Sequence, residues 1–251
     1  MTNTGTRPLR RLVLAAALWL PAMFFVWVYW SSVFALPATS MARTVLERGF
    51  GDIFHSTYLG MPRGVVAAGA HLPVQPGTPM EGATARDDHI VVVRFAEGAM
   101  PAPMLAEKRR SGEEPLAMVN SMIFGYGLAL IWGLVLATPL PARRRWLQMA
   151  IGWLAIALVQ AFGVVTGALA NALQFLGADS LRANGLNPDL VAGLYQFGYL
   201  ILPAVVPVVL WMLMNRRFIE SMVASAEPLA ARPVNVHPDG GPVPAADVEK
   251  P

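Results

Sequence analysis

The hydrophobic pattern of the chain consists of four long apolar runs separated by two short polar segments and one long one. The runs cover residues 12–36, 117–140, 146–176 and 188–214, and Asp189 is the one charged residue within them. A helix needs about 20 apolar residues to cross a hydrocarbon core about 30 Å thick, and each run reaches that length. The pattern therefore predicts an all-α integral membrane protein with four transmembrane helices.

The first run predicts a retained membrane anchor, with a cleaved signal peptide as the alternative. It is longer than the apolar core of a signal peptide, which usually has about 7–15 residues. Trp27, Tyr29 and Trp30 stand near its outer end, where aromatic side chains commonly anchor a helix at the membrane surface.

The long polar segment, residues 37–116, predicts a small α+β extracytoplasmic domain between the first two transmembrane helices. A short helix is expected over residues 40–48, and strands over residues 64–70 and 89–95. Few large apolar side chains are available to form a core. We therefore expect this domain to lean on the membrane bundle or on a partner.

Basic residues gather before the first run, between the second and third runs, and after the fourth run. They are Arg7, Arg10, Arg11, Arg143, Arg144, Arg145, Arg216 and Arg217. If all four runs cross the membrane, these three places lie on the same side of it. Such basic ends face the cytoplasm, so residues 1–11 and 218–251 are predicted to be cytoplasmic and residues 37–116 periplasmic. The tail from Glu227 onward is rich in proline and poor in large apolar residues, so it is expected to be mostly disordered.

The fourth run has the most distinctive pattern. Asn187 and Pro188 form a helix-opening signal, because the asparagine side chain accepts from free amides and proline has no amide to leave unpaired. From Tyr195 onward, every fourth residue is aromatic or proline: Tyr195, Tyr199, Pro203, Pro207 and Trp211. This spacing marks one face of a helix, and the prolines predict a kink. We predict that this face contacts a partner or packs against other helices.

Small and polar residues in the runs predict further helix packing. Gly163 and Gly167 form a GxxxG motif, which Asn171 extends along a similar face, and small residues there let a second helix approach closely. Neutral amides lie in or beside the runs, namely Asn120, Gln148, Gln160, Asn171, Gln174 and Gln196. We expect them to bond between helices rather than to line a substrate path.

Composition narrows the possible functions. The chain is 55% hydrophobic and 14% charged, whereas soluble domains are about 25% charged. Eight arginines at the run ends account for much of the positive charge of the chain, and arginines there set the membrane orientation. No nucleic-acid partner is therefore expected. The chain has no cysteine, which excludes thiolate metal sites and cysteine nucleophiles. Ionisable residues are absent from the middle of the runs, which argues against proton-coupled transport.

The histidines give little support for a metal or catalytic site. His55, His71, His89 and His237 all lie outside the runs and show no metal-ligand spacing. A metal or catalytic site made by His55 and His71 with Asp52, Asp87 or Asp88 is the alternative, but ordinary surface or loop histidines explain these residues better. We expect no catalytic residue, no metal and no cofactor.

The layout resembles a known family. The first run contains FFVWVYWSS, the second begins NSMIFGYGLAL, and the fourth contains LYQFGYLILPAVVPVVLW. These segments look like those of the exosortase H-associated membrane proteins of Gram-negative bacteria. The resemblance implies a multi-pass protein of the inner membrane with both termini cytoplasmic, whose partner is an exosortase or its sorted substrates. The proposed active site of exosortases needs Cys, Arg and His, so this cysteine-free chain is not expected to be the processing enzyme.

Three functions compete at this level. The first is a non-enzymatic accessory protein of an exosortase-type protein-sorting system, acting through helix–helix and periplasmic-domain contacts with the bilayer as its setting. The alternative is a small transporter or permease subunit, supported by the interrupted fourth helix and the amides. An enzyme using the outer histidines ranks last.

Overall fold

The computed structural model describes residues 7–59, 89–112 and 115–226. Some predictions lie outside the described residues: the strand at residues 64–70, His71, His237 and the tail from residue 227.

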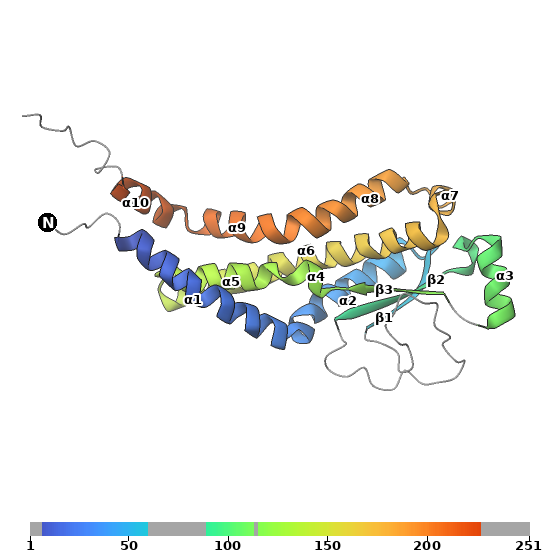
Figure 1. The fold of residues 1–251 in the computed structure, drawn as a ribbon, viewed down its shortest axis with the longest axis horizontal. Coiled ribbons are helices and arrows are strands. Elements are labelled where there is room, and N and C mark those ends of the chain that lie inside the picture. Colours follow the sequence, from blue (N-terminus) through green and yellow to red (C-terminus); the bar gives the residue numbers. More distant parts are fainter. Residues whose placement is uncertain (1–6, 60–88, 113–114, 227–251) are drawn as a thin grey trace, which may run out of the picture.

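Helices dominate the described chain, and most of the longer ones follow the long axis of an elongated molecule (Figure 1). The longer helices are α1 (Arg7–Tyr29), α2 (Ser31–Gly49), α3 (Ala102–Ser111), α5 (Gly127–Ala137), α6 (Ala142–Leu176), α8 (Pro188–Gln196), α9 (Leu202–Met214) and α10 (Arg216–Ala226). Shorter helical elements are η1 (Glu97–Ala99), α4 (Met122–Gly125), α7 (Ala178–Ala183) and the π-helix η2 (Phe197–Ile201). The strands are β1 (Phe54–Leu59), β2 (Ile90–Phe95) and β3 (Leu116–Asn120).

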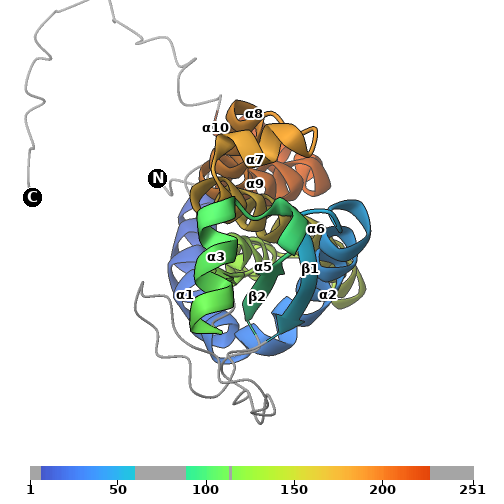
Figure 2. The ribbon, with the colours of Figure 1, turned by 90° about the vertical axis from the view of Figure 1, so that its right-hand side faces the viewer.

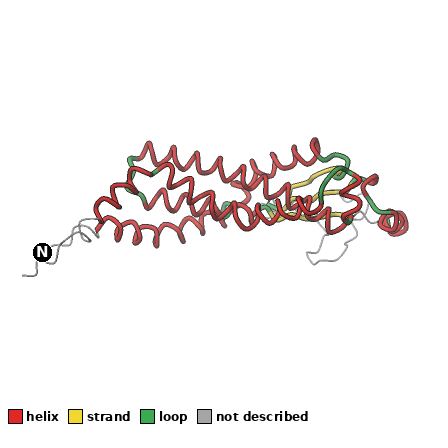
Figure 3. Tube along the Cα trace, turned by 90° about the horizontal axis from the view of Figure 1, so that it is seen from above, coloured by secondary structure: helices red, strands yellow, loops and turns green. Residues whose placement is uncertain are grey.

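The two ends of the molecule differ in structure. The start of α1, the connection from α5 to α6, and α10 share one end, which we call the arginine end. The sheet, α3 and α7 lie at the other, which we call the sheet end (Figures 1 and 3). Figure 2 looks onto the sheet end, with α3 and the strands in front of the helices.

Three helical segments are long and apolar enough to cross a membrane. They are Leu9–Tyr29, Ala142–Leu176 and Pro188–Met214, which correspond to the first, third and fourth predicted runs. The predicted helix over residues 146–176 is confirmed as part of the 35-residue α6. At 1.5 Å per residue α6 is about 52 Å long, so it exceeds the thickness of a hydrocarbon core by about 20 Å.

The second predicted span, residues 117–140, is wrong in its first part. Residues Leu116–Asn120 form β3, and the apolar helical segment that follows, Met122–Ala137, is shorter than the other three. The sequence LAMVN has no charge and suits either state, so hydropathy alone does not separate a buried strand from a helix. Pairing with β2 along its whole length makes it a strand.

The first predicted span, residues 12–36, is also divided. The helix α1 ends at Tyr29, Trp30 leaves helical geometry with φ −103° and ψ 18°, and α2 begins at Ser31. The short helix predicted over residues 40–48 is the second half of α2. Its buried residues, among them Ala38, Ala42 and Leu46, pack into the core of the sheet end, which explains the new helix direction after Trp30.

The three strands form an antiparallel sheet in the order β1–β2–β3. The predicted strand at residues 89–95 is confirmed as β2, whose valines suit a pleated, buried surface. In the register, Val91 faces Val119 and Val93 faces Ala117. These four side chains belong to one buried core with residues of α2 and α6.

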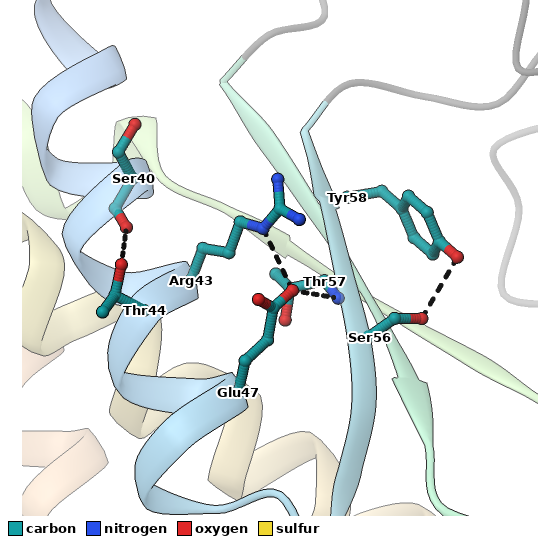
Figure 4. Close-up of polar contacts among 7 residues, drawn as sticks. All are labelled: Ser40, Arg43, Thr44, Glu47, Ser56, Thr57 and Tyr58. Carbon is teal, nitrogen blue, oxygen red and sulfur yellow. Dashed lines mark hydrogen bonds and ion pairs between the residues drawn. The ribbon is translucent and has the colours of Figure 1, made fainter.

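Both edges of the sheet are capped by helix side chains. At the β1 edge, Glu47 Oε1 of α2 accepts from the Thr57 backbone N–H at 3.1 Å and from Arg43 Nε at 3.0 Å (Figure 4). At the β3 edge, Asn171 Nδ2 of α6 donates to the Met118 backbone oxygen at 3.1 Å. Unpaired edge groups invite pairing with other chains, and each of these bonds satisfies one such group at its edge.

The buried core is continuous from the sheet into the helices. One cluster joins the sheet with α2, α4, α6 and α8, and a second joins α1, α5, α6 and α9. The sheet therefore packs on the helical bundle, as expected from the few large apolar side chains of residues 37–116.

Candidate functional site

The fourth apolar run begins as predicted. Asn187 Oδ1 accepts from the backbone N–H groups of Asp189 at 2.9 Å and Leu190 at 3.3 Å, and Pro188 is the first helical residue. The run then continues through α8, η2 and α9 to Met214.

A π turn, Phe197–Ile201, interrupts this run shortly before Pro203. The Leu202 backbone N–H donates to the Phe197 oxygen five residues earlier, and Pro203, which has no N–H, follows. Figure 1 shows the segment changing direction between α8 and α9. The predicted kink thus takes the form of a π turn, a feature often found at functional positions.

The π turn also corrects the drift of the four-residue repeat. Residues spaced by four advance by about 40° per step around an α-helix, so an uninterrupted repeat from Tyr195 to Trp211 would turn by about 160°. One extra residue in a π turn moves the later residues back by about 100°. As a result Pro203, Pro207 and Trp211 are all buried on the bundle side, the side on which Tyr195 packs.

An aromatic cluster joins the half of this run nearer the sheet end to α4. Tyr195 and Tyr199 stack with ring centroids 5.9 Å apart and planes at 10°. The Phe124 ring meets Tyr195 at 6.5 Å and Tyr199 at 6.4 Å, edge to face in both cases. Phe124 is fully buried, whereas Tyr199 is 41% exposed.

The two glycines of the GxxxG motif make room for Phe124. A Cβ atom at Gly163 would lie 2.3 Å from Phe124 Cγ and Cδ1, closer than atoms can pack. A Cβ atom at Gly167 would lie 3.1 Å from Val119 Cγ1 and 3.4 Å from Phe124 Cζ. The motif therefore makes room for Phe124 of α4 and Val119 of β3, rather than for a second long helix.

The half of the run nearer the arginine end packs against α5. A Cβ atom at Gly127 would lie 2.7 Å from the Pro203 oxygen and 2.8 Å from Pro207 Cγ. Trp211 Nε1 donates to Thr138 Oγ1 at 3.0 Å, and Thr138 Oγ1 donates to the Leu134 oxygen at 2.7 Å.

A second polar contact joins α6 to the residue after α9 at the arginine end. The side-chain amides of Gln148 and Asn215 exchange two hydrogen bonds, at 3.0 Å and 3.1 Å, and both residues are buried. Asn215 also donates to the Trp211 oxygen at 3.0 Å, and Arg144 donates to the Met214 oxygen at 2.8 Å. This pair joins α6 to the end of α9.

The remaining amides divide into paired and exposed groups. Gln160 Nε2 donates to the Ser121 oxygen at 3.0 Å, and half-buried Asn171 caps β3. Asn120 Oδ1 accepts from the Met122 backbone N–H. Gln174 and Gln196 are exposed. Sequence reasoning missed Phe124, Gly127, Thr138 and Asn215, because only the fold brings them to the fourth run.

The described histidines take no part in this site. Among the residues that the structure describes, no group of three or more His, Asp or Glu side chains gathers in a way that would hold a metal ion. On the outer face of the sheet, Ser56 Oγ donates to the Tyr58 hydroxyl at 3.1 Å (Figure 4), and Arg94 donates to the same oxygen at 3.1 Å. These two bonds lower the pKa of Tyr58 below its usual value.

Comparison with known proteins identifies a family. The family model described as exosortase H-associated membrane protein matches residues 6–218, which include α1, the sheet and the whole fourth run. No curated protein and no solved structure shows significant similarity to the chain. With the match spanning far more than half of its length, the chain belongs to the exosortase H-associated membrane proteins.

Proposed function

We propose that this protein is a non-enzymatic accessory subunit of an exosortase-type sorting system, and that it binds its membrane partner through the outer part of its fourth run. The family description states the association with exosortase H. The observation that supports the contact site is an exposed surface on α8 and the π turn. We call this surface the outer ridge, formed by Gln196, Phe197, Tyr199, Leu200 and Ile201, all exposed.

The outer ridge combines apolar side chains with two polar groups at membrane depth. Tyr199 lies 15 residues before Met214, so it is about 22 Å away along the helix and inside a core about 30 Å thick. The structure shows no hydrogen bond between the Tyr199 hydroxyl or the Gln196 amide and any other described residue. A polar group left unpaired in hydrocarbon costs free energy, so a partner helix that accepts these groups would bind preferentially there.

An accessory role fits the rest of the bundle better than transport does. The buried amides Gln148 and Gln160 both bond to protein groups, and so does half-buried Asn171. Polar side chains that line a substrate path would instead face a water-filled space. The small transporter subunit therefore remains the weaker proposal.

The same proposal includes four crossings with both termini in the cytoplasm. The segment Met122–Ala137 is short for a crossing, at about 24 Å. It packs between α1, α6 and α9, and Leu20 of α1 lies against Gly133. The arginine end then faces the cytoplasm, and the bilayer thins locally or the flanking residues reach its surface.

The test is co-purification with exosortase H at matched membrane levels. Tyr199→Phe combined with Gln196→Leu removes both polar groups and keeps the side-chain size. Because one interhelical hydrogen bond contributes about 0.6–2 kcal/mol, we expect partner recovery to fall by about tenfold.

Leu213→Ala is the matched control, since Leu213 is 67% exposed on the inner half of the same run. A photo-crosslinker at residue 200 should capture the exosortase, and one at residue 213 should not. Capture from residue 213 alone would overturn the proposed contact site. Failure of the wild-type chain to recover any exosortase would overturn the accessory role.

A further inference from the structure

The arginine end carries basic side chains that no described carboxylate pairs. Arg10, Arg11, Arg143, Arg144, Arg216 and Arg217 are exposed, Arg145 is half-buried, and Glu220 is the one acidic residue of α10. The salt bridges among the described residues involve other basic side chains, at the sheet end. A concentrated positive surface is left at this end.

The start of α6 is electrostatically unfavourable for its own arginines. Three of them follow Ala142 directly, and the first turn of α6 has no acidic residue. The positive end of a helix dipole repels cations, and this helix is 35 residues long. Arg144 and Arg145 each donate to a backbone oxygen, of Met214 and Leu140, but the buried Nε of Arg145 has no partner among the described residues.

The helix α10 is amphipathic. At 100° per residue, Phe218, Ile219, Met222 and Val223 fall within an arc of about 140°, and Arg216, Arg217, Glu220 and Ser221 occupy the opposite arc. Ile219 packs on the bundle core, whereas Val223 is 63% exposed. An apolar stripe beside arginines is typical of a helix lying in the membrane surface.

The helix α10 begins almost directly where α9, part of a candidate membrane span, ends. Asn215 alone separates it from α9, and the last turn of α9 exposes Met212 and Leu213. Asn215 is itself held by Gln148, so α10 must leave the bundle at the level where α9 meets the membrane surface.

We infer that α10 lies in the headgroup layer of the same membrane and that it forms, with the arginines at the start of α6, a binding surface for anionic phospholipids. The apolar stripe enters the acyl boundary, and the guanidinium groups bind lipid phosphates. Lipid is favoured over a soluble partner because α10 follows α9 after a single residue, and the last turn of α9 exposes the apolar side chains Met212 and Leu213.

The first experiment measures the depth of α10 in vesicles of phosphatidylglycerol and phosphatidylcholine. Because the chain has no cysteine, Val223→Cys gives a single labelling site on the apolar stripe, and Ala224→Cys gives its matched control on the polar side. A fluorophore at residue 223 should be quenched by spin-labelled lipid, and one at residue 224 by a water-soluble quencher. Water quenching at both positions would overturn the interfacial placement.

The second experiment measures lipid selectivity by titrating short-chain phosphatidylglycerol or phosphatidylcholine into the detergent-solubilised full chain. Each arginine near an anionic surface contributes about a fivefold gain in affinity. Arg143→Gln with Arg216→Gln and Arg217→Gln should therefore weaken phosphatidylglycerol binding by about 100-fold.

The matched control removes three arginines of the sheet end, with Arg109→Gln, Arg110→Gln and Arg182→Gln, and should leave binding unchanged. Equal loss in both triple variants, or equal affinity of the wild-type chain for the two lipids, would overturn the anionic-lipid site.

Discussion

Replacing Gly163 by alanine tests whether the GxxxG motif exists to seat Phe124. The new Cβ atom would lie 2.3 Å from two ring atoms of Phe124, whereas carbon atoms pack at about 3.5–4.0 Å. The ring must therefore move by more than about 1 Å. Phe124 is fully buried and meets both Tyr195 and Tyr199.

The expected cost follows from these contacts. Overpacking a close-packed site costs about 1–3 kcal/mol, and each aromatic pair contributes about 0.5–1.5 kcal/mol. Gly163→Ala should therefore destabilise the protein by about 2–6 kcal/mol if both pairs are lost. That corresponds to a fall of roughly 4–24 °C in the unfolding midpoint of a chain of this size.

The control is the same substitution in the same kind of helix. A Cβ atom at Gly193 in α8 would meet nothing within 4 Å, so Gly193→Ala should be neutral or stabilising by up to about 1 kcal/mol. Thermal unfolding of the full chain in detergent compares the two variants directly.

A double variant then identifies the clash. In a Phe124→Ala background the clashing Cγ and Cδ1 atoms are gone, so Gly163→Ala should cost at least about 1 kcal/mol less than it does alone. Equal midpoints for Gly163→Ala and Gly193→Ala would refute the reasoning. So would strictly additive effects in the double variant.

Two further predictions concern the bundle. Trp211→Phe removes the donor to Thr138 and should cost about 1 kcal/mol, measured as a lower unfolding midpoint; a neutral result would show that this bond adds no stability. Reporter fusions after Arg94 should be active only as periplasmic reporters, and fusions after Arg145 or Glu220 only as cytoplasmic ones; cytoplasmic activity at Arg94 would exclude the proposed orientation.

Local signals made several elements predictable. The start of the fourth run at Asn187 depends on a cap whose partners lie two and three residues away. The helix α6 and the strand β2 each carry a long, consistent pattern, and both were predictable on that basis.

The elements that escaped prediction depend on distant partners. The strand β3 is apolar and uncharged, and its pairing with β2 joins it to residues that precede it by about 25 positions. The strand β1 is half polar, and the Thr57 amide at its edge is satisfied by Glu47 of α2. Neither contact can be read from a window of a few residues.

The candidate site was predictable as a set of positions but not as a set of contacts. The four-residue repeat singled out Pro203, Pro207 and Trp211, yet it carried no sign of the π turn that brings them onto the bundle side. The GxxxG motif indicated close approach, but its partner Phe124 comes from a short helix that hydropathy merged with β3.

The length and continuity of α6 have a mechanical consequence. It contains no proline, its part at the sheet end bonds to β3 through Asn171, and its part at the arginine end bonds to Asn215 after α9 through Gln148. One uninterrupted helix therefore joins the sheet end to the arginine end. A tilt of the sheet would be transmitted along α6 to Asn215 and the start of α10 as the rigid movement of a single helix.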